Sequence, residues 1–483
     1  MASLIVGRVS ESQILATTLA SDQPELVAVY GRRRVGKTFL IRTYYGKQLA
    51  FELSGVSGAH TKDQLKNFAH QLKQAMGASI PPRAPETWSE AFRDLAVFLE
   101  PRLAKHESKV VVFLDELPWL ASRRSGFLPA LQHFWNSWGS RKNNLVLVVC
   151  GSAASWMIHN VIKAKGGLHN RITRRIRLQP FTLQETHQYL ESRHIKLDTY
   201  QTLELYMAMG GIPHYLKEVR RGQSAATCID RVCFSQDGLL RDEFSILYQS
   251  LFERADRHER VVRALAKHSQ GLPRRSLLKV LKVTTGGNIT KVLEELEVCG
   301  FIMQTNPFGK IRKEALFRLQ DEYSLFFLRW IQRERGQGKN VWLTRRGTPA
   351  WRAWSGYAFE SVCLRHVDDI KRGLGIAGVE TSVSSWFLQG TDTKQGAQID
   401  LVIDRKDMCI NLCEMKFSAE PFDIDKKYAA VLRAKSQAFA AETGTKKTLF
   451  VTLITAAGVK PSAHSQLTVG AEVAAQVFFA RPT

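Results

Sequence analysis

The sequence is short of acidic residues and of paired cysteines, and each shortage narrows the classes of protein to consider. Only 45 Asp and Glu stand against 68 Lys and Arg among 483 residues, which gives a formal net charge of +23. Such an excess favours a polyanionic partner, with nucleic acid the first expectation and an acidic membrane surface the second. The seven cysteines are odd in number and show no C-x-x-C spacing. We therefore expect a reduced protein without structural zinc.

Long apolar runs are also missing. No stretch of about 18 apolar residues is present, so we expect no membrane-spanning helix. The opening "MASLIVGRVSESQ" lacks a basic leader before a long apolar stretch, so we expect no signal peptide. These features predict a cytoplasmic protein without membrane partners. With 44% hydrophobic residues the chain is globular and long enough for two to four domains.

Residues 25–45, "ELVAVYGRRRVGKTFLIRTYY", combine an apolar strand, a G-x-x-x-x-G-K-[ST] loop and an amphipathic helix. Gly31 and Gly36 allow the backbone to bend so that successive N–H groups converge on phosphate oxygens at a helix N-terminus. We expect Lys37 to reach the β- and γ-phosphates of ATP, and the Thr38 hydroxyl to coordinate Mg²⁺. The predicted nucleotide-binding residues of this loop are Gly31, Arg32, Arg33, Arg34, Val35, Gly36, Lys37, Thr38 and Phe39.

Two further apolar strands end in polar residues. "VVFLDELPWL" places Asp115 and Glu116 at a strand end, and "NNLVLVVCGSAASWM" places Ser152 at another. Because ligands lie beyond the carboxyl ends of parallel strands, these ends are expected to meet at one nucleotide. Asp115 is then the acid that organises Mg²⁺, and Glu116 the base that polarises the attacking water. Ser152 either senses the γ-phosphate or the attacking water, or caps the next helix.

Five motifs carry a family resemblance. "GRRRVGKTFLI", "VVFLDELPWL", "VVCGSAASWM", "LHNRITRRIRLQPF" and "GGIPHYL" occur in the order and at roughly the distances found in the archaeal and bacterial ATPase family of the AAA/STAND-like P-loop group, which residues 1–220 resemble. The opening "IVGRVSES" resembles the family's start near the adenine, with Gly7 and Arg8 as contacts, although Glu11 stands one place further along. The resemblance implies an ATP-binding domain with a helical lid.

The same resemblance points to a homo-oligomer formed through the ATPase domain. Arg171 is the position that resembles the family's arginine, which reaches the γ-phosphate of a neighbouring subunit. Such an arginine neutralises charge on the transferred phosphoryl group. The plain alternative is a solvated basic edge, because Arg174, Arg175 and Arg177 follow at once.

Residues 255–320 read as three helices followed by two strands, an order typical of a winged helix-turn-helix. The third helix would enter a DNA major groove and the strand pair would touch the backbone. The alternative is a packing module, because Glu294, Glu295 and Glu297 on the third helix would repel a groove. The predicted phosphate contacts are Arg274, Arg275, Lys291, Lys310 and Arg312.

The last third contains a helix with Glu360, the strand "AQIDLVID" with Asp400, and a strand that ends in Glu414 and Lys416. Residues two apart on a strand share a face, so Glu414 and Lys416 point the same way. Carboxylates on adjacent strands can hold Mg²⁺ against a scissile phosphate while a lysine activates water. Glu360 would add or orient a ligand. A plain β-hairpin is the alternative.

This order of acids and lysine resembles the PD-(D/E)xK nuclease superfamily, and in particular the nuclease-like domain that accompanies this ATPase family. The proline that often precedes the strand aspartate is missing here. The resemblance implies metal ligands at Glu360, Asp400 and Glu414, with Asp400, Glu414 and Lys416 as catalytic residues. The basic residues on the helix that follows are expected to line a phosphate track; they are Lys426, Lys427, Arg433 and Lys435.

The sequence thus predicts an α/β protein made of a P-loop NTPase core with a parallel sheet (1–180), a helical lid (181–250), a winged helix-turn-helix (251–320), a helical connector (321–345) and an α/β nuclease-like domain (346–483). We predict an ATP-hydrolysing, DNA-associated protein with ATP and Mg²⁺ as cofactors and a metal-dependent nuclease-like domain. The alternative is a regulatory ATPase switch whose nuclease-like domain only binds nucleic acid or partners.

Overall fold

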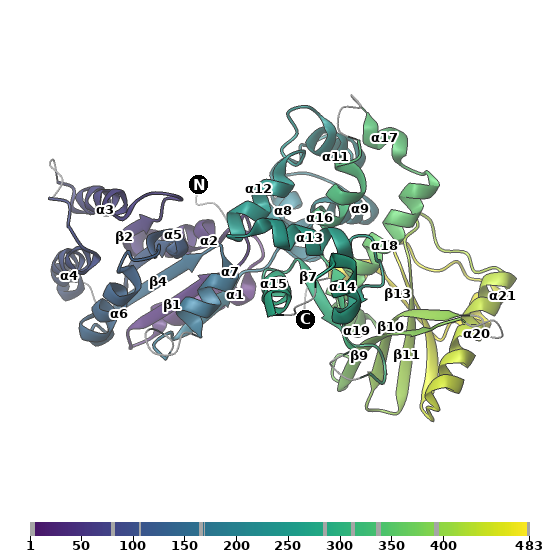
Figure 1. Ribbon diagram of the computed structural model, residues 1–483. Helices are drawn as coiled ribbons and strands as arrows, with labels where there is room; N and C mark the ends of the chain where they lie inside the picture. Colours follow the sequence, from purple (N-terminus) through teal and green to yellow (C-terminus); the bar gives the residue numbers. More distant parts are fainter. Residues whose placement is uncertain are drawn as a thin grey trace. The chain divides into compact units, whose positions relative to one another are not determined.

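The chain forms two compact units, each described separately below. The computed structural model describes residues 5–78, 83–105, 108–163, 168, 170–283, 287–310, 314–334, 340–390 and 396–480. The first unit comprises Met1–Gln179 with Ser250–Glu253, and the second comprises Pro180–Gln249 with Arg254–Thr483 (Figure 1). The predicted domain boundaries are finer than this division and stay predictions, and Arg312 lies outside the described residues.

The first unit is built on a five-stranded sheet of order β2-β3-β4-β1-β5 in which all strand pairs are parallel. The α/β class predicted from the sequence is confirmed here, although the edge strand β2 was not foreseen. Its elements are α1 Val9–Ala20, β1 Glu25–Tyr30, α2 Lys37–Tyr45, η1 Gly46–Gln48, β2 Leu49–Ser54, α3 Thr61–Met76, α4 Trp88–Lys105, β3 Val110–Asp115, α5 Leu117–Leu120, α6 Phe127–Ser137, η2 Gly139–Arg141, β4 Leu145–Gly151, α7 Ala154–Met157, η3 Ile158–Ile162 and β5 Arg174–Arg177.

Both faces of the central strands β1, β3 and β4 are buried. Val110, Val112 and Leu114 of β3 pack in one cluster with Phe92 of α4 and Phe134 of α6. The alternate residues of β3 point to the opposite face and are buried as well. Burial on both faces explains why the strands read as continuous apolar runs, the pattern typical of parallel sheets.

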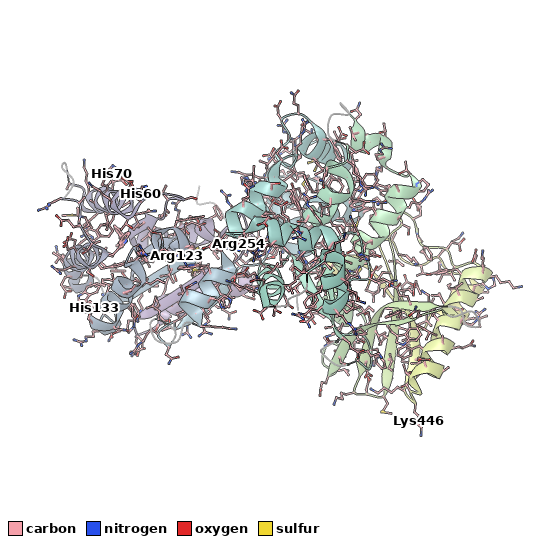
Figure 2. All side chains as sticks on the ribbon, in the orientation of Figure 1. His60, His70, Arg123, His133, Arg254 and Lys446 are labelled. Atoms are coloured by element: carbon pink, nitrogen blue, oxygen red, sulfur yellow. The ribbon has the colours of Figure 1, made fainter. Side chains whose placement is uncertain are left out.

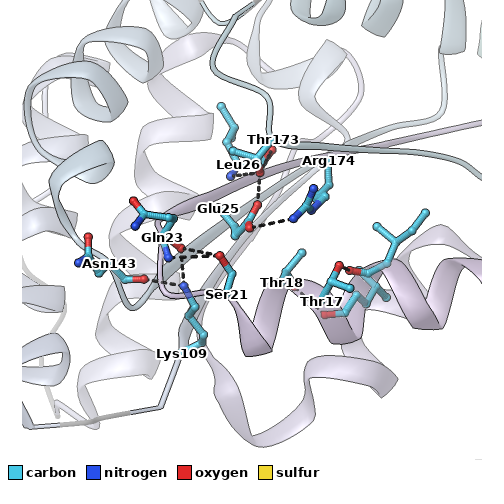
Figure 3. Close-up of polar contacts among 12 residues, drawn as sticks. Thr17, Thr18, Ser21, Gln23, Glu25, Leu26, Lys109, Asn143, Thr173 and Arg174 are labelled. Atoms are coloured by element: carbon cyan, nitrogen blue, oxygen red, sulfur yellow. Dashed lines mark hydrogen bonds and ion pairs between the residues drawn. The ribbon is translucent and has the colours of Figure 1, made fainter.

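Polar side chains join the strand starts at the amino-terminal edge of the sheet (Figure 3). The Lys109 ammonium donates to the backbone carbonyl oxygens of Gln23 and Asn143, and burial lowers its pKa. Glu25, buried at the start of β1, accepts a hydrogen bond from the Thr173 hydroxyl. These contacts fix the relative heights of β1, β3, β4 and β5, and therefore the points at which the strands end.

The second unit begins with helices and a small three-stranded antiparallel sheet of order β6-β8-β7. The helices before this sheet module are α8 Leu183–Ser192, α9 Thr199–Met209, α10 Pro213–Leu216, α11 Ala225–Phe234 and α12 Glu243–Leu251. The module itself contains α13 Ala255–Leu265, β6 Leu272–Pro273, α14 Arg274–Leu281, α15 Gly287–Val298, β7 Ile302–Thr305 and β8 Leu316–Leu319. The strand β6 was not foreseen from the sequence.

A five-stranded mixed sheet of order β13-β12-β11-β10-β9 dominates the carboxyl-terminal part. β10 is antiparallel to both its neighbours, whereas β11, β12 and β13 run parallel. Helix α20 connects the parallel strands β11 and β12. The elements are α16 Glu322–Phe326, η5 Phe327–Ile331, α17 Val341–Arg345, α18 Pro349–Arg365, α19 Val367–Gly373, β9 Thr381–Leu388, β10 Ala397–Arg405, β11 Cys409–Lys416, α20 Lys426–Thr443, β12 Thr448–Thr455, α21 Ala463–Thr468, β13 Ala471–Ala474 and η6 Ala475–Phe479.

Buried aromatic rings and one ion pair hold the helices of the second unit together. Phe326, Trp330, Trp342 and Trp354 pack with ring centroids 4.9–6.3 Å apart. Nearby, both carboxylate oxygens of the fully buried Glu204 accept hydrogen bonds of 3.0 Å from the Arg346 guanidinium. This bidentate pair links α9 to the segment before α18.

His366, between α18 and α19, is a buried histidine with both ring nitrogens engaged. Nδ1 donates to the Val362 carbonyl at 2.8 Å, which leaves Nε2 to accept from the Leu183 backbone N–H at 3.3 Å. Burial lowers the pKa of this imidazole to about 4. The ring is therefore neutral at neutral pH and links α18 to α8.

Exposed basic side chains occur on both units, among them Arg123 and Lys446 (Figure 2). Among the described residues, no helix has the length and apolar character that crossing a bilayer requires.

Candidate functional site: a P-loop and a carboxyl-terminal acid cluster

The P-loop connects β1 to α2 and depends on two glycines. Gly31 has φ +153°, and a Cβ atom there would lie 2.2 Å from the Leu178 carbonyl oxygen, so no side chain fits. Gly36 has φ +94°, a backbone conformation that favours glycine. The buried Lys37 ammonium donates to the carbonyl oxygens of Gly31 at 3.1 Å and Arg32 at 3.0 Å. The ammonium thus lies inside the loop, where anionic oxygens bind in such loops.

The strand ends meet beside this loop. The Thr38 hydroxyl donates to a carboxylate oxygen of Asp115 at 2.6 Å. The backbone N–H of Glu116 donates to the other Asp115 oxygen at 2.9 Å. Glu116 itself, in the left-handed region with φ +48°, accepts from the Ser152 hydroxyl at 2.7 Å and from the Ser152 N–H at 3.2 Å. One connected network therefore joins Thr38, Asp115, Glu116 and Ser152.

The structure tests one of the two roles predicted for Ser152, that of a cap for the next helix. Helix α7 begins at Ala154, and its N-cap residue is Ala153, without a side-chain cap hydrogen bond. Ser152 is therefore not the helix cap, because its hydroxyl is committed to Glu116. Its proposed role at the γ-phosphate or the attacking water stays a prediction.

The segment before α1 also lies against the loop. Arg8 is buried, donates to the Val35 carbonyl oxygen at 3.1 Å, and lies 3.6 Å from the Glu11 carboxylate. Glu11 therefore pairs with Arg8 even though it stands one place further along than the resemblance implies. Gly7 has φ +64° and lets the chain turn into α1.

The remaining predicted contacts differ in exposure. Arg32 is buried in the loop, Arg34 has φ +70°, Arg33 is exposed, and Phe39 is 51% exposed on α2.

The oxygen donors at this edge suit Mg²⁺ bound with a nucleotide. Mg²⁺ prefers oxygen ligands and takes few from the protein when it also binds phosphates. The Thr38 hydroxyl and the Asp115 carboxylate, already in contact, are donors of this type. Bound there, the ion would neutralise charge on the phosphates. Glu116 would hold and polarise water, and Lys37 would bind phosphate oxygens.

Arg171 lies in an exposed turn before β5. No partner of its guanidinium is recorded among the residues that the structure describes. Arg174 and Arg175 follow on the edge strand β5 and are also exposed. Both alternatives for Arg171, the arginine that acts in a neighbouring subunit and the solvated basic edge, stay open.

Comparison with known proteins identifies the domain that carries the P-loop. Residues 5–219 match the family described as an ATPase domain predominantly from Archaea. This part of the chain is therefore similar to a P-loop ATPase domain. An uncharacterized protein of Methanocaldococcus jannaschii, MJECL04, is 23% identical over 331 residues, which are 68% of this chain and 69% of that protein.

Two solved structures are similar to this chain to different degrees. The Walker-type ATPase PABY2304 of Pyrococcus abyssi matches with a TM-score of 0.50 and 20% identity, over 67% of this chain and 96% of that one. The ORC2 protein of Aeropyrum pernix, in ADPNP and ADP complexes, matches with a TM-score of 0.42 and 15% identity, over 72% of this chain and 97% of that one. The first of these likenesses supports the P-loop ATPase fold.

A second candidate site lies on the carboxyl-terminal sheet, around Glu414 at the end of β11. This buried carboxylate accepts from the Lys435 ammonium of α20 and from the Tyr428 hydroxyl at 3.5 Å. The Lys416 ammonium lies 3.6 Å away and 5.4 Å from the Tyr428 ring centroid. Glu414 and Lys416 therefore share the face that α20 covers.

Asp400 of β10 lies next to this cluster. One of its carboxylate oxygens accepts from the Met415 N–H at 3.3 Å. Burial, with Glu360 and then Glu414 as negative neighbours, raises the pKa of the Asp400 carboxyl well above its usual range. The structure thus brings Asp400, Glu414 and Lys416 together, and Glu360 within electrostatic reach of Asp400.

The four residues are not gathered as a metal cage. Across the described residues, no group of three or more His, Cys, Asp or Glu side chains could hold a metal ion. Phe359, the neighbour of Glu360 on α18, packs against Phe417, which directly follows β11.

Glu360 is also engaged by a cation. Its carboxylate accepts from the Arg318 guanidinium of β8 at 2.5 Å, and both side chains are largely buried. In this arrangement the predicted carboxylates do not fit a divalent ion, and their role as ligands stays a prediction.

The predicted nucleic-acid contacts are dispersed over the second unit. Arg274 donates to the Thr290 hydroxyl at 3.1 Å, and Lys291 lies 3.9 Å from Glu295 on α15. Arg275 and Lys310 are exposed and line one large cavity. Lys426 and Lys427 are exposed at the start of α20. Their contacts with nucleic acid stay predictions.

Sequence reasoning missed the cation Arg318, and it expected Lys435 to line a phosphate track, whereas the structure pairs Lys435 with Glu414. The helical spacing holds a signal for Lys435, because residues seven apart share a face and Tyr428 also contacts Glu414. Arg318 gave no such signal, since its partner Glu360 lies 42 residues away and in another element.

Proposed function

We propose that this chain is an ATP-hydrolysing, DNA-associated protein whose nucleotide state controls a carboxyl-terminal, nuclease-like domain. The observation that carries the ATPase part is the connected network of Thr38, Asp115, Glu116 and Ser152, which lies at the strand ends beside the buried Lys37 of the loop. It supplies a phosphate-binding ammonium, oxygen donors for Mg²⁺, and a carboxylate for the attacking water.

The test for ATP hydrolysis compares the wild type with Lys37→Ala and Glu116→Gln. We expect Lys37→Ala to lose nucleotide binding, and Glu116→Gln to keep binding but lose turnover. Binding is measured with a fluorescent ATP analogue and turnover by phosphate release. Hydrolysis at the wild-type rate in both variants would exclude this site as the catalytic centre.

For the second unit, we propose that residues 251–320 act as a winged helix-turn-helix and that residues 346–483 form a PD-(D/E)xK nuclease-like domain that binds DNA. The three helices and three short antiparallel strands support the first proposal. Asp400, Glu414 and Lys416 on adjacent strands support the second. The net charge of +23 supports a nucleic-acid partner for the chain.

Cleavage is tested with linear, nicked and branched DNA in Mg²⁺ or Mn²⁺, with Asp400→Ala and Lys416→Ala beside the wild type. Lys406→Ala is the matched control, because Lys406 is exposed and its salt bridge to Glu380 is exposed as well. Cutting that both site variants lose and the control retains would establish cleavage at this site. Lys37→Ala would then report whether ATP controls it.

One observation favours the alternative, in which the chain is an ATPase switch whose nuclease-like domain binds without cutting. Arg318 neutralises Glu360, and Lys435 and Lys416 neutralise Glu414. Salt-sensitive DNA binding with no cutting by the wild type in either metal would establish this alternative. We also propose that Arg171 acts across a homo-oligomer, which predicts turnover per chain that rises with protein concentration and is lost in Arg171→Ala.

A further inference from the structure

A cavity of about 990 Å³ lies within the second unit, between the small sheet module and the carboxyl-terminal sheet. Its volume is at the top of the range of pockets that enclose drug-sized molecules. The module contributes Arg275, Lys310 and Arg318. The carboxyl-terminal part contributes the aromatic ring of Phe387 and the acid Glu360. Three basic side chains therefore line the same cavity as the predicted acids Glu360 and Asp400.

The two walls are joined by direct contacts. The Phe308 N–H, after β7, donates to the Ser385 carbonyl oxygen of β9 at 2.7 Å. The Phe308 ring lies 5.0 Å from the Phe439 ring of α20, centroid to centroid. The cavity therefore lies entirely within the second unit, and its shape does not depend on the position of the ATPase domain.

Arg318 is the unusual residue of this cavity. Its side chain is 5% exposed, and its guanidinium lies 4.7 Å from the Tyr357 ring centroid. Nη1 donates to Glu360, while Nε and Nη2 have no hydrogen-bond partner within the described part of the chain. Buried donors of a charged group are normally satisfied, so a guanidinium with two unpaired nitrogens at a cavity wall is suited to bind an anionic ligand.

We propose that the cavity binds the sugar–phosphate backbone of a single nucleic-acid strand, and that Arg318 exchanges its Glu360 partner for a phosphate of that strand. The inference rests on the proposed DNA association but not on cleavage. A planar guanidinium binds carboxylate and phosphate with the same two-pronged geometry, so the exchange replaces one strong partner by another. Phe387, 54% exposed at the cavity wall, offers a ring on which a base can stack.

This exchange predicts opposite effects for the two partners. Glu360→Gln removes the acid that competes for Arg318, so it should tighten binding of single-stranded DNA several-fold. Arg318→Gln removes the phosphate contact and should weaken binding about tenfold. It should also reduce the slope of log affinity against log salt concentration by about 0.7, the value for one phosphate contact on a single strand. If the salt bridge between Arg318 and Glu360 were purely structural, both Arg318→Gln and Glu360→Gln would weaken DNA binding.

The experiment measures anisotropy of a labelled single-stranded DNA and of its duplex, in EDTA so that no cutting occurs. Arg318→Gln is made alone and together with Glu360→Gln, which avoids leaving a buried unpaired acid. Phe387→Ala changes an exposed side chain, so it tests the same cavity even if the Arg318 variants misfold. We expect Phe387→Ala to bind the single strand more weakly than the wild type does. Lys406→Ala is the control and should match the wild type.

The outcomes separate this inference from the proposed function. The exchange is overturned if Arg318→Gln and Phe387→Ala bind single-stranded DNA as tightly as the wild type does. It is also overturned if Glu360→Gln binds more weakly than the wild type. In both cases the proposed DNA association still holds. Tighter binding of duplex than of single strand overturns the choice of ligand. Failure of the wild type to bind either DNA overturns the proposed DNA association itself.

Discussion

His366 gives the second unit a built-in sensitivity to acid. In the folded chain burial lowers the pKa of the imidazole to about 4, against a usual value of 6.5. Above pH 6.5 the ring is neutral in both folded and unfolded chains. Between pH 6.5 and 4 the unfolded chain takes up a proton that the folded chain does not, so stability falls as the pH falls. The loss is complete below about pH 4 and amounts to about 3 kcal/mol, since one pKa unit is worth about 1.4 kcal/mol.

The assay is urea unfolding followed by tryptophan fluorescence at pH 7, 5.5 and 4, for the wild type and His366→Gln. Glutamine can accept from the Leu183 N–H but cannot take up a proton, so the variant lacks this part of the pH dependence. Other groups titrate equally in both proteins, so the difference between them isolates His366. We expect the wild type to lose about 3 kcal/mol more than the variant between pH 7 and 4. Parallel pH profiles would refute the reasoning.

Three further predictions concern the P-loop network and the buried ion pair. Gly31→Ala places a Cβ against the Leu178 carbonyl oxygen, so nucleotide affinity should fall at least tenfold in a titration with fluorescent ATP. The control Gly378→Ala, where a Cβ meets open space and φ is not in the left-handed region, should fold and bind normally. Ser152→Ala frees Glu116 from its hydroxyl partner and should change turnover more than ATP affinity; equal effects on both would contradict this. Arg346→Ala leaves the Glu204 carboxylate buried and unpaired, so the free energy of unfolding should fall by about 3–5 kcal/mol, and Glu204→Gln in the same background should restore part of it.

The sequence was most informative where chemistry and local geometry coincide. The loop from Gly31 to Thr38 needs its residues at fixed spacing because consecutive N–H groups must converge, so pattern alone located it. Asp115 and Ser152 were expected at strand ends, and parallel strands bring such ends together. The hydrogen bond that joins Ser152 to Glu116 could not be foreseen, because a serine before a helix has an equally good local use as a cap.

The carboxyl-terminal cluster was less predictable because its contacts depend on packing. That Glu414 and Lys416 share a face follows from strand alternation, and the 3.6 Å contact agrees with it. Which cations reach the acids depends on how α20 and β8 pack against the sheet. Arg318 and Glu360 belong to elements without any local sequence relation, so their pairing is visible only in three dimensions.

The contact between Phe308 and β9 has a practical consequence for anyone who expresses the carboxyl-terminal domain alone. β9 is an edge strand with Val383 40% and Phe387 54% exposed, and the segment around Pro307 pairs with it at Ser385. A fragment that begins near residue 346 would lack this cover and present an unpaired apolar edge, which promotes strand-to-strand association between molecules. Fragments that retain the small sheet module should stay monodisperse, whereas shorter ones should aggregate during purification.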